Sequence, residues 1–199
     1  MKKSKSKSKL IFIIFVFLLF IIAAIIMGYR AAKQCEYEYR LAAHPKHYSE
    51  FVAKYAAEYE VDEDLIYAVI KTESDFDSSA VSNVGARGLM QIMSETFDWI
   101  KYRLDDDESV YDDMFDPETN IRYGAYLIDY LLEKFGDKDT AIAAYHSGAG
   151  SVSSWLEDSE NSADGKRLDN IPSSTAAHYV NKINNALSNY KELYNNERN

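Results

Sequence analysis

The chain has 199 residues, of which 47% are hydrophobic, and its formal net charge at pH 7 is −10. This length accommodates one ordinary domain with a packed core and a short appendage. Residues 1–33 hold seven Lys or Arg and no acid, so the remainder holds 15 basic residues against all 32 acidic ones. A domain with that balance repels phosphate backbones, which excludes nucleic acid as an expected partner.

A basic head and a long apolar run open the chain. Residues 1–9 alternate Lys and Ser after the first Met, and residues 10–27 are 18 apolar residues without a charge. A helix needs roughly 17–25 such residues to cross a bilayer, and lysines before it favour a cytoplasmic N-terminus. A cleaved signal peptide is the alternative, but its apolar region is usually about 7–15 residues long, and residues 30–33 form a poor cleavage site. We therefore predict a single-pass signal anchor over residues 10–29, with the rest of the chain outside the cytoplasm.

After the anchor, the sequence predicts a short stalk and then one domain. Residues 30–46 are mixed and polar and contain Pro45, whereas apolar residues at helical spacing begin at residue 47 and continue to about residue 195. Cys35 is the only cysteine, so no disulfide forms within the chain. It is either a thiol without a role, close to the membrane, or half of an intermolecular disulfide.

The periodicity of the domain is that of helices. Asp62 is placed as the N-cap of a helix that ends near Glu73, and Ser94 as the N-cap of another. Asp116 and Pro117 begin a third helix that Gly136 ends. Helical apolar patterns also cover residues 47–60, 140–145 and the segment after Pro172. No useful alternation with a period of two occurs, so we predict a mainly α domain.

Glu73 is the candidate catalytic residue. It continues the apolar face of its helix, four residues after Val69 and three after Ile70, and apolar surroundings keep a carboxyl group protonated near neutral pH. That is the state a general acid requires, although a Glu at the end of a helix is usually a solvated surface residue. Gly85 and Gly88 follow, and Gln91 brings an amide among apolar residues. This combination is typical of a cleft for a polyhydroxy ligand.

These residues carry a family resemblance. Residues 73–96 read Glu-Ser-x-Phe-x-x-x-Ala-x-Ser-x-x-Gly-Ala-x-Gly-Leu-Met-Gln-Ile-Met-x-x-Thr, a pattern that closely resembles the soluble-lytic-transglycosylase (SLT) domain family. The resemblance covers roughly residues 55–183. It implies a lysozyme-like helical domain that cleaves the glycan strands of bacterial peptidoglycan, with Glu73 as the catalytic acid.

Three later stretches match the family with some departures. Asp-Pro-x-x-Asn-Ile, starting at Asp116, resembles the family's pattern and is implied to pack behind the cleft. The family's Ala-Tyr-Asn-Ala-Gly appears with Tyr145 kept and with His146 and Ser147 in place of Asn and Ala. In the last helix Tyr179 is kept, whereas Thr175 and Ala176 stand where the family has Glu-Thr. The sequence leaves open whether His146 is catalytic or has a binding or capping role.

The resemblance implies a reaction that needs one acid. Glycosidases normally use two carboxylates, but in this family the C6 hydroxyl of N-acetylmuramic acid attacks its own C1 and gives a 1,6-anhydro product. Peptidoglycan and the membrane are the expected partners, and a membrane complex is left unspecified. This reaction implies no cofactor or metal. The acidic run at residues 105–108 is either a solvated loop or a calcium site, although it lacks the spacing of an EF-hand loop. The residues expected to line the groove are Ser82, Gln91, Met93, Tyr145, His146 and Tyr179.

Two other functions remain open at this point. A lysozyme-like hydrolase on the same fold would give reducing ends instead of anhydro ends. A wall-binding scaffold would bind glycan without cleaving it, and the substitutions at His146 and Thr175 would then mark lost activity.

Overall fold

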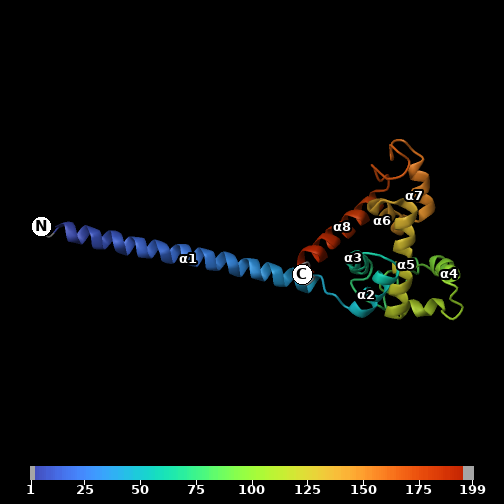
Figure 1. Cartoon of the computed structure of the whole chain (residues 1–199), viewed down its shortest axis with the longest axis horizontal. Coiled ribbons are helices and arrows are strands. Elements are labelled where there is room, and N and C mark those ends of the chain that lie inside the picture. Colours follow the sequence, from blue (N-terminus) through green and yellow to red (C-terminus); the bar gives the residue numbers. More distant parts are fainter. Residues whose placement is uncertain (1–2, 195–199) are drawn as a thin grey trace. The chain divides into compact units, whose positions relative to one another are not determined.

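A computed structural model describes residues 3–194 and divides into two compact units on either side of the bond between Pro45 and Lys46 (Figure 1). The first unit contains one helix, α1 (Lys3–Ala43), which includes residues 30–43 of the predicted stalk. Within it, the segment of residues 9–43 is long enough to cross a membrane and contains an 18-residue stretch with a mean hydropathy of 3.5, none of which is buried. By length and composition, this helix meets the requirements of the predicted anchor.

The second unit is mainly α, as predicted. Its described residues contain no β-strand, only the isolated bridges Val81–Arg87 and Arg87–Ile92. Helix α7 was not foreseen from the sequence, and it follows α6 with only Gly148 between them. The elements in chain order are α2 (Ser49–Glu58), α3 (Glu63–Glu73), α4 (Ser94–Arg103), the 3-10 helix η1 (Tyr111–Phe115), α5 (Pro117–Phe135), α6 (Lys138–Ser147), α7 (Ala149–Leu156) and α8 (Ser174–Tyr194).

Most helix ends follow the local signals of the sequence. The Asp62 carboxylate accepts the backbone NH of Asp64, and the Asp116 carboxylate accepts that of Thr119, so both act as N-caps. Gly136 ends α5 with φ of 65°. The prediction for Ser94 was wrong by one residue: the N-cap of α4 is Met93, which is extended and makes no side-chain cap, and Ser94 is already helical.

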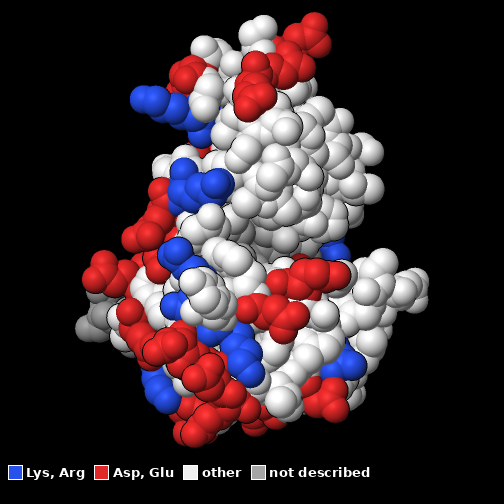
Figure 2. Space-filling view, turned by 90° about the vertical axis from the view of Figure 1, so that its right-hand side faces the viewer, with Lys and Arg blue, Asp and Glu red and all other residues white. Residues whose placement is uncertain are grey.

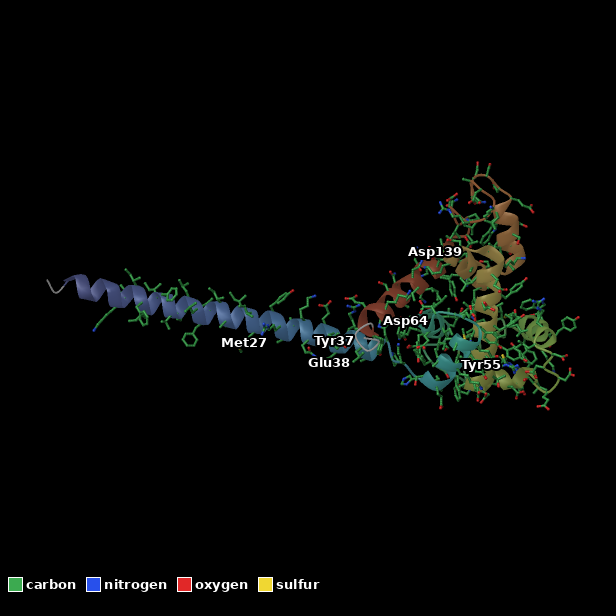
Figure 3. All side chains as sticks on the ribbon, viewed as in Figure 1. Met27, Tyr37, Glu38, Tyr55, Asp64 and Asp139 are labelled. Carbon is green, nitrogen blue, oxygen red and sulfur yellow. The ribbon has the colours of Figure 1, made fainter. Side chains whose placement is uncertain are left out.

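Helices α3, α5, α6 and α8 enclose the core of the second unit. Fully buried aliphatic side chains come from α3 (Ile66, Ile70), α5 (Ile121) and α8 (Ile183). Polar contacts also join neighbouring helices of this unit. Tyr55 Oη on α2 donates to Glu118 on α5, and Asn184 on α8 donates to Asp139 on α6 at 3.0 Å; Tyr55 and Asp139 are labelled in Figure 3. The second contact joins α8 to α6, and the candidate site lies on these two helices and on α3.

Candidate active site

Glu73 is the last residue of α3 and lies mostly inside the domain. Its Oε1 accepts a hydrogen bond of 2.5 Å from the hydroxyl of Tyr179, on α8. Burial raises the pKa of the Glu73 carboxyl above its usual range, while the Tyr179 hydrogen bond and the positive charge of Lys182 act against that rise. The carboxyl therefore holds its proton to a higher pH than a solvated Glu, which is the property that the helical spacing predicted.

The loop after Glu73 is fastened to the end of α3. Ser74 Oγ donates to the carbonyl oxygen of Leu89 at 2.8 Å, so residues 85–93 lie beside the last turn that carries Glu73. Gly88 has φ of 74°, and a Cβ there would lie 1.9 Å from the carbonyl oxygen of Met114. Only glycine satisfies both conditions, which explains why the loop needs a glycine at this position.

Asn120 holds the same loop from behind. Its side chain is fully buried: Nδ2 donates to the carbonyl oxygens of Met114 at 2.8 Å and Arg87 at 3.0 Å, and Oδ1 accepts the NH of Met90 at 2.8 Å. The sequence pattern indicated only that Asn120 lies in the first turn of a helix behind the cleft. Its role in holding the loop was missed, although a buried amide in an apolar helix face would have been the signal.

Two of the predicted groove residues use their polar groups to hold the loop. Ser82 Oγ accepts the backbone NH groups of Ala86 at 3.0 Å and Val84 at 3.3 Å. Gln91 has φ of 49°, and its Nε2 donates to the carbonyl oxygens of Gly88 at 2.9 Å and Ala80 at 3.2 Å. Met93 is partly exposed where the loop meets α4. A sugar contact by Ser82, Gln91 or Met93 stays a prediction.

The other three predicted residues lie close to Glu73 or to one another. Tyr145 Oη, at the end of α6, donates to the carbonyl oxygen of Met90 at 2.8 Å, and burial together with the nearby Glu73 raises its pKa well above the usual value. Burial and Glu73 raise the pKa of Tyr179 in the same way. The ring of His146 stacks on the ring of Tyr179. The structure thus brings Glu73, Tyr145, Tyr179 and His146 together from three helices.

A pocket of about 330 Å³ borders Tyr145 on the side of α4, α5 and α7. Trp99 and Tyr130 form an aromatic wall there, with ring centroids 4.7 Å apart, and Glu95 and Thr96 supply polar groups. Phe97 is buried, whereas Trp99 is partly exposed and lines this pocket. An aromatic wall with a few polar groups is the usual character of a site for a sugar ring.

The acidic residues near Glu73 in sequence are engaged elsewhere. Asp75 forms an ion pair with Lys71, and Asp77 accepts both the NH and the hydroxyl of Ser79. In the acidic run, Asp106 accepts hydrogen bonds from Tyr123 and Ser109, which gives it a structural role. Among the described residues, no three His, Cys, Asp or Glu side chains lie together as metal ligands. Figure 2 shows one face of the molecule, on which acidic side chains outnumber basic ones.

Comparison with known proteins gives consistent matches. The chain is 32% identical over 142 residues to the soluble lytic murein transglycosylase of Escherichia coli K12, covering 70% of this chain and 22% of that one. It is 31% identical over 166 residues to the membrane-bound lytic murein transglycosylase C of Yersinia pestis, covering 72% and 46%. The chain therefore spans less than half the length of these relatives.

Solved structures of two lytic transglycosylases resemble the domain. An inactive Glu-to-Gln mutant of the lytic transglycosylase Slt from Pseudomonas aeruginosa matches with a TM-score of 0.68 and 27% identity, covering 76% of this chain and 25% of that one. The 70 kDa soluble lytic transglycosylase of E. coli matches with a TM-score of 0.68 and 29% identity, covering 75% and 25%. The model of the transglycosylase SLT domain family matches residues 50–168. The chain belongs to this family, and its helical domain has the lysozyme-like fold of the solved lytic transglycosylases.

Proposed function

We propose that the chain is a peptidoglycan lytic transglycosylase. It cleaves the β-1,4 bond between N-acetylmuramic acid and N-acetylglucosamine without water and leaves 1,6-anhydro-muramic ends. The observation that carries the proposal is the Glu73 carboxyl, whose pKa is raised by burial and which accepts the Tyr179 hydroxyl at 2.5 Å. An acid held protonated in one orientation is what protonation of a glycosidic oxygen requires.

In the proposed reaction, Glu73 acts twice. The protonated carboxyl first gives its proton to the glycosidic oxygen, so the C1–O bond breaks and C1 becomes positively charged. The resulting carboxylate then takes the proton of the C6 hydroxyl of the same sugar while the C6 oxygen bonds to C1. The proton lost in the first step is regained in the second, so the enzyme returns to its starting state without a water molecule or a second carboxylate.

The surroundings of Glu73 favour this one-acid route over hydrolysis. The groups that set its pKa are the protein interior, Tyr179 and Lys182, and within the described chain no carboxylate is among them. Asp75 and Asp77, the acids closest in sequence, are held by Lys71 and Ser79. Glycosidases that add water normally place a second carboxylate within about 5–9.5 Å of the first.

The pocket beside Tyr145 extends the proposed glycan groove. Trp99 and Tyr130 would stack on a sugar ring away from the bond that breaks, and Glu95 and Thr96 would bind its hydroxyl groups. The earlier assignments of Ser82, Gln91, Met93, Tyr145 and Tyr179 as groove residues belong to this proposal.

We further propose that α1 anchors the enzyme in the cell membrane as a single-pass segment, with residues 1–9 in the cytoplasm and the domain on the cell-wall side. The length and hydropathy of residues 9–43 support an anchor, and the lysines before it support this orientation. One relative, from Y. pestis, is named as membrane-bound.

The test is digestion of purified peptidoglycan by the full-length protein in detergent, followed by mass spectrometry of the products. Muropeptides lighter than hydrolysis products by one water, without reducing muramic ends, are expected. Glu73→Gln should lower the rate by roughly 10²–10⁴-fold while glycan binding persists; the P. aeruginosa Slt mutant described as inactive carries the same type of exchange. Asp77→Asn, an exposed acid four residues away, is the matched control and should retain the rate.

Each other outcome selects a different function. Reducing ends would identify a hydrolase, and a second carboxylate would then have to be sought. Binding without any product would identify a wall-binding scaffold. Full activity of Glu73→Gln would remove Glu73 from the mechanism.

A further inference from the structure

The ring of His146 lies on the ring of Tyr179. The two centroids are 4.6 Å apart and the planes differ by 19°, so this is a stacked pair. His146 lies in the last turn of α6 and Tyr179 in the second turn of α8. His146 is exposed as a residue, whereas Tyr179 is 7% exposed. The imidazole therefore covers the phenol from the solvent side.

Tyr179 is the residue whose hydroxyl reaches the acid, with Oη 2.5 Å from Oε1 of Glu73. A hydrogen bond of this length depends on the direction in which the phenol points, and a turn of the Tyr179 ring about its Cα–Cβ bond would carry the hydroxyl away from the carboxyl. His146 lies against the face of this ring. The contact thus restricts the motion that would break the hydrogen bond to Glu73.

We propose that His146 is a positioning residue, whose ring stacks on Tyr179 and so keeps the Tyr179 hydroxyl on Oε1 of Glu73. The inference goes beyond the proposed function, since it assigns His146 a role through Tyr179 rather than a contact with the sugar. It rests on the proposed transglycosylase function only in the experiment that measures cleavage. The family pattern has Asn at this position, so the stacked pair is a feature of this chain's own sequence.

The groups around the pair support this role. Partial burial of its ring lowers the pKa of His146, which favours the uncharged imidazole in the stacked pair. Two titratable groups shift the pKa of Glu73, namely Tyr179 and Lys182, both from α8. The negative charge of Glu73 in turn raises the pKa of Tyr145 on α6. Because the Tyr179 hydrogen bond lowers the pKa of Glu73, loss of that bond must raise it.

The test that does not depend on cleavage is a ¹³C NMR titration of the Glu73 carboxyl in the full-length protein, with the resonance assigned by its loss in Glu73→Gln. His146→Ala should raise the pKa of Glu73 in the same direction as Tyr179→Phe. In the double variant, the pKa should equal that of Tyr179→Phe alone, since the hydrogen bond is already absent. His146→Phe keeps a ring on Tyr179 and should keep the pKa of the unmodified protein. His178→Ala, an exposed histidine next to Tyr179 on α8, is the control and should leave it unchanged.

Kinetics on peptidoglycan provide the second measurement. His146→Ala should lower kcat about two- to tenfold, with KM unchanged, and should have no further effect in the Tyr179→Phe background. An unchanged Glu73 pKa in His146→Ala, or an effect that adds in full to that of Tyr179→Phe, would overturn the proposal. A higher KM in both backgrounds would also overturn it, because His146 would then contact the sugar itself. If Glu73→Gln still cleaves at the full rate, the proposed role of Glu73 in cleavage fails, whereas the titration still decides the role of His146.

Discussion

The side-chain oxygen of Asn120 accepts the backbone NH of Met90 at 2.8 Å, and the carbonyl oxygen of the same Met90 accepts the hydroxyl of Tyr145 at 2.8 Å. One peptide segment is therefore held from both sides, by the first turn of α5 and by the last turn of α6. The Ser74 hydroxyl donates to the carbonyl oxygen of the neighbouring Leu89, so this segment is also attached to the end of α3, where Glu73 lies.

Replacement of Asn120 by Ala should destabilise the domain by about 2–4 kcal/mol. The substitution leaves the NH of Met90 and the carbonyl oxygen of Met114 buried without their partner, and each such group costs about 1–3 kcal/mol. The free energy of unfolding in urea measures the effect. Asn181→Ala, at an exposed position of α8, is the matched control and should change it by less than about 0.5 kcal/mol. A loss at Asn120 no larger than in this control would contradict the proposed role of the amide.

Substitutions at Gly85 and Gly88 separate the cost of a left-handed backbone from the cost of a steric clash. Both have positive φ, of 74° and 87°, but a Cβ at Gly88 would meet the Met114 carbonyl at 1.9 Å, while one at Gly85 would meet nothing within 4 Å. Gly85→Ala should therefore cost only the left-handed backbone, about 1–2 kcal/mol. Gly88→Ala should cost clearly more, because the chain around Met114 must move. Thermal unfolding of the two variants measures the stability that each has lost. Equal losses of stability would show that the close approach of Gly88 to Met114 does not contribute to the cost of the substitution.

Glu73→Gln should stabilise the protein in a pH-dependent way. The pKa of Glu73 is raised in the folded state, so its protonated form adds stability below the unfolded value of about 4.3, and this is lost as pH rises through the folded pKa. The neutral Gln should thus give no gain at about pH 4 and its full gain at about pH 8. Urea unfolding across this range measures the difference.

Asp77→Asn should change the pH dependence of stability in the opposite direction to Glu73→Gln. Hydrogen bonds from Ser79 lower the pKa of Asp77, so its contribution to stability is present at high pH and disappears as pH falls. The Asn variant should be slightly less stable than the unmodified protein at about pH 8 and equal to it at low pH.

A gain in the stability of Glu73→Gln that did not vary with pH would contradict the first of these two predictions. It would mean that Glu73 is not buried in its charged form.

Trp99→Ala should weaken glycan binding rather than catalysis. Trp99 lines the pocket beside Tyr145, and Glu73 is not among the residues that line it, so KM for glycan strands should rise about two- to tenfold while kcat stays within about twofold. Steady-state kinetics on defined glycan oligomers measure both constants. Tyr102→Ala, three residues along α4 and 84% exposed, lies outside the pocket and should change neither. Equal values for Trp99→Ala and the unmodified protein would exclude the pocket from the glycan groove.

Local signals were enough to predict much of the fold. Asp62, Asp116 and Gly136 act through neighbours a few residues away, and their roles as helix caps were therefore readable from the sequence. The burial of Glu73 followed from its position on the apolar face of α3. The role of Ser82 was harder to predict, because a short hydroxyl side chain either binds a ligand or forms hydrogen bonds with nearby backbone groups. In the structure its hydroxyl oxygen accepts two backbone NH groups.

Long-range relations could not be predicted in this way. Asn120 binds residues 30 and 33 positions earlier in the chain, and the pocket joins Trp99 on α4 to Tyr130 on α5. Nothing in the local pattern of these residues specifies the partner, since helix packing brings them together. The family resemblance indicated Tyr179 as a groove residue, but it did not indicate that Tyr179 binds Glu73.

The hydrogen bond between Tyr179 and Glu73 joins residues that are 106 positions apart, and Tyr179 lies beyond the stretch of residues 50–168 that the family model matches. A chain that is still being synthesised therefore has an acid without its donor until α8 has emerged and docked on α3. Contacts of such sequence separation form late, because the long loop must close first. The proposed glycan-cleaving site would thus be assembled last, and a chain truncated before α8 would carry Glu73 without the partner that orients it.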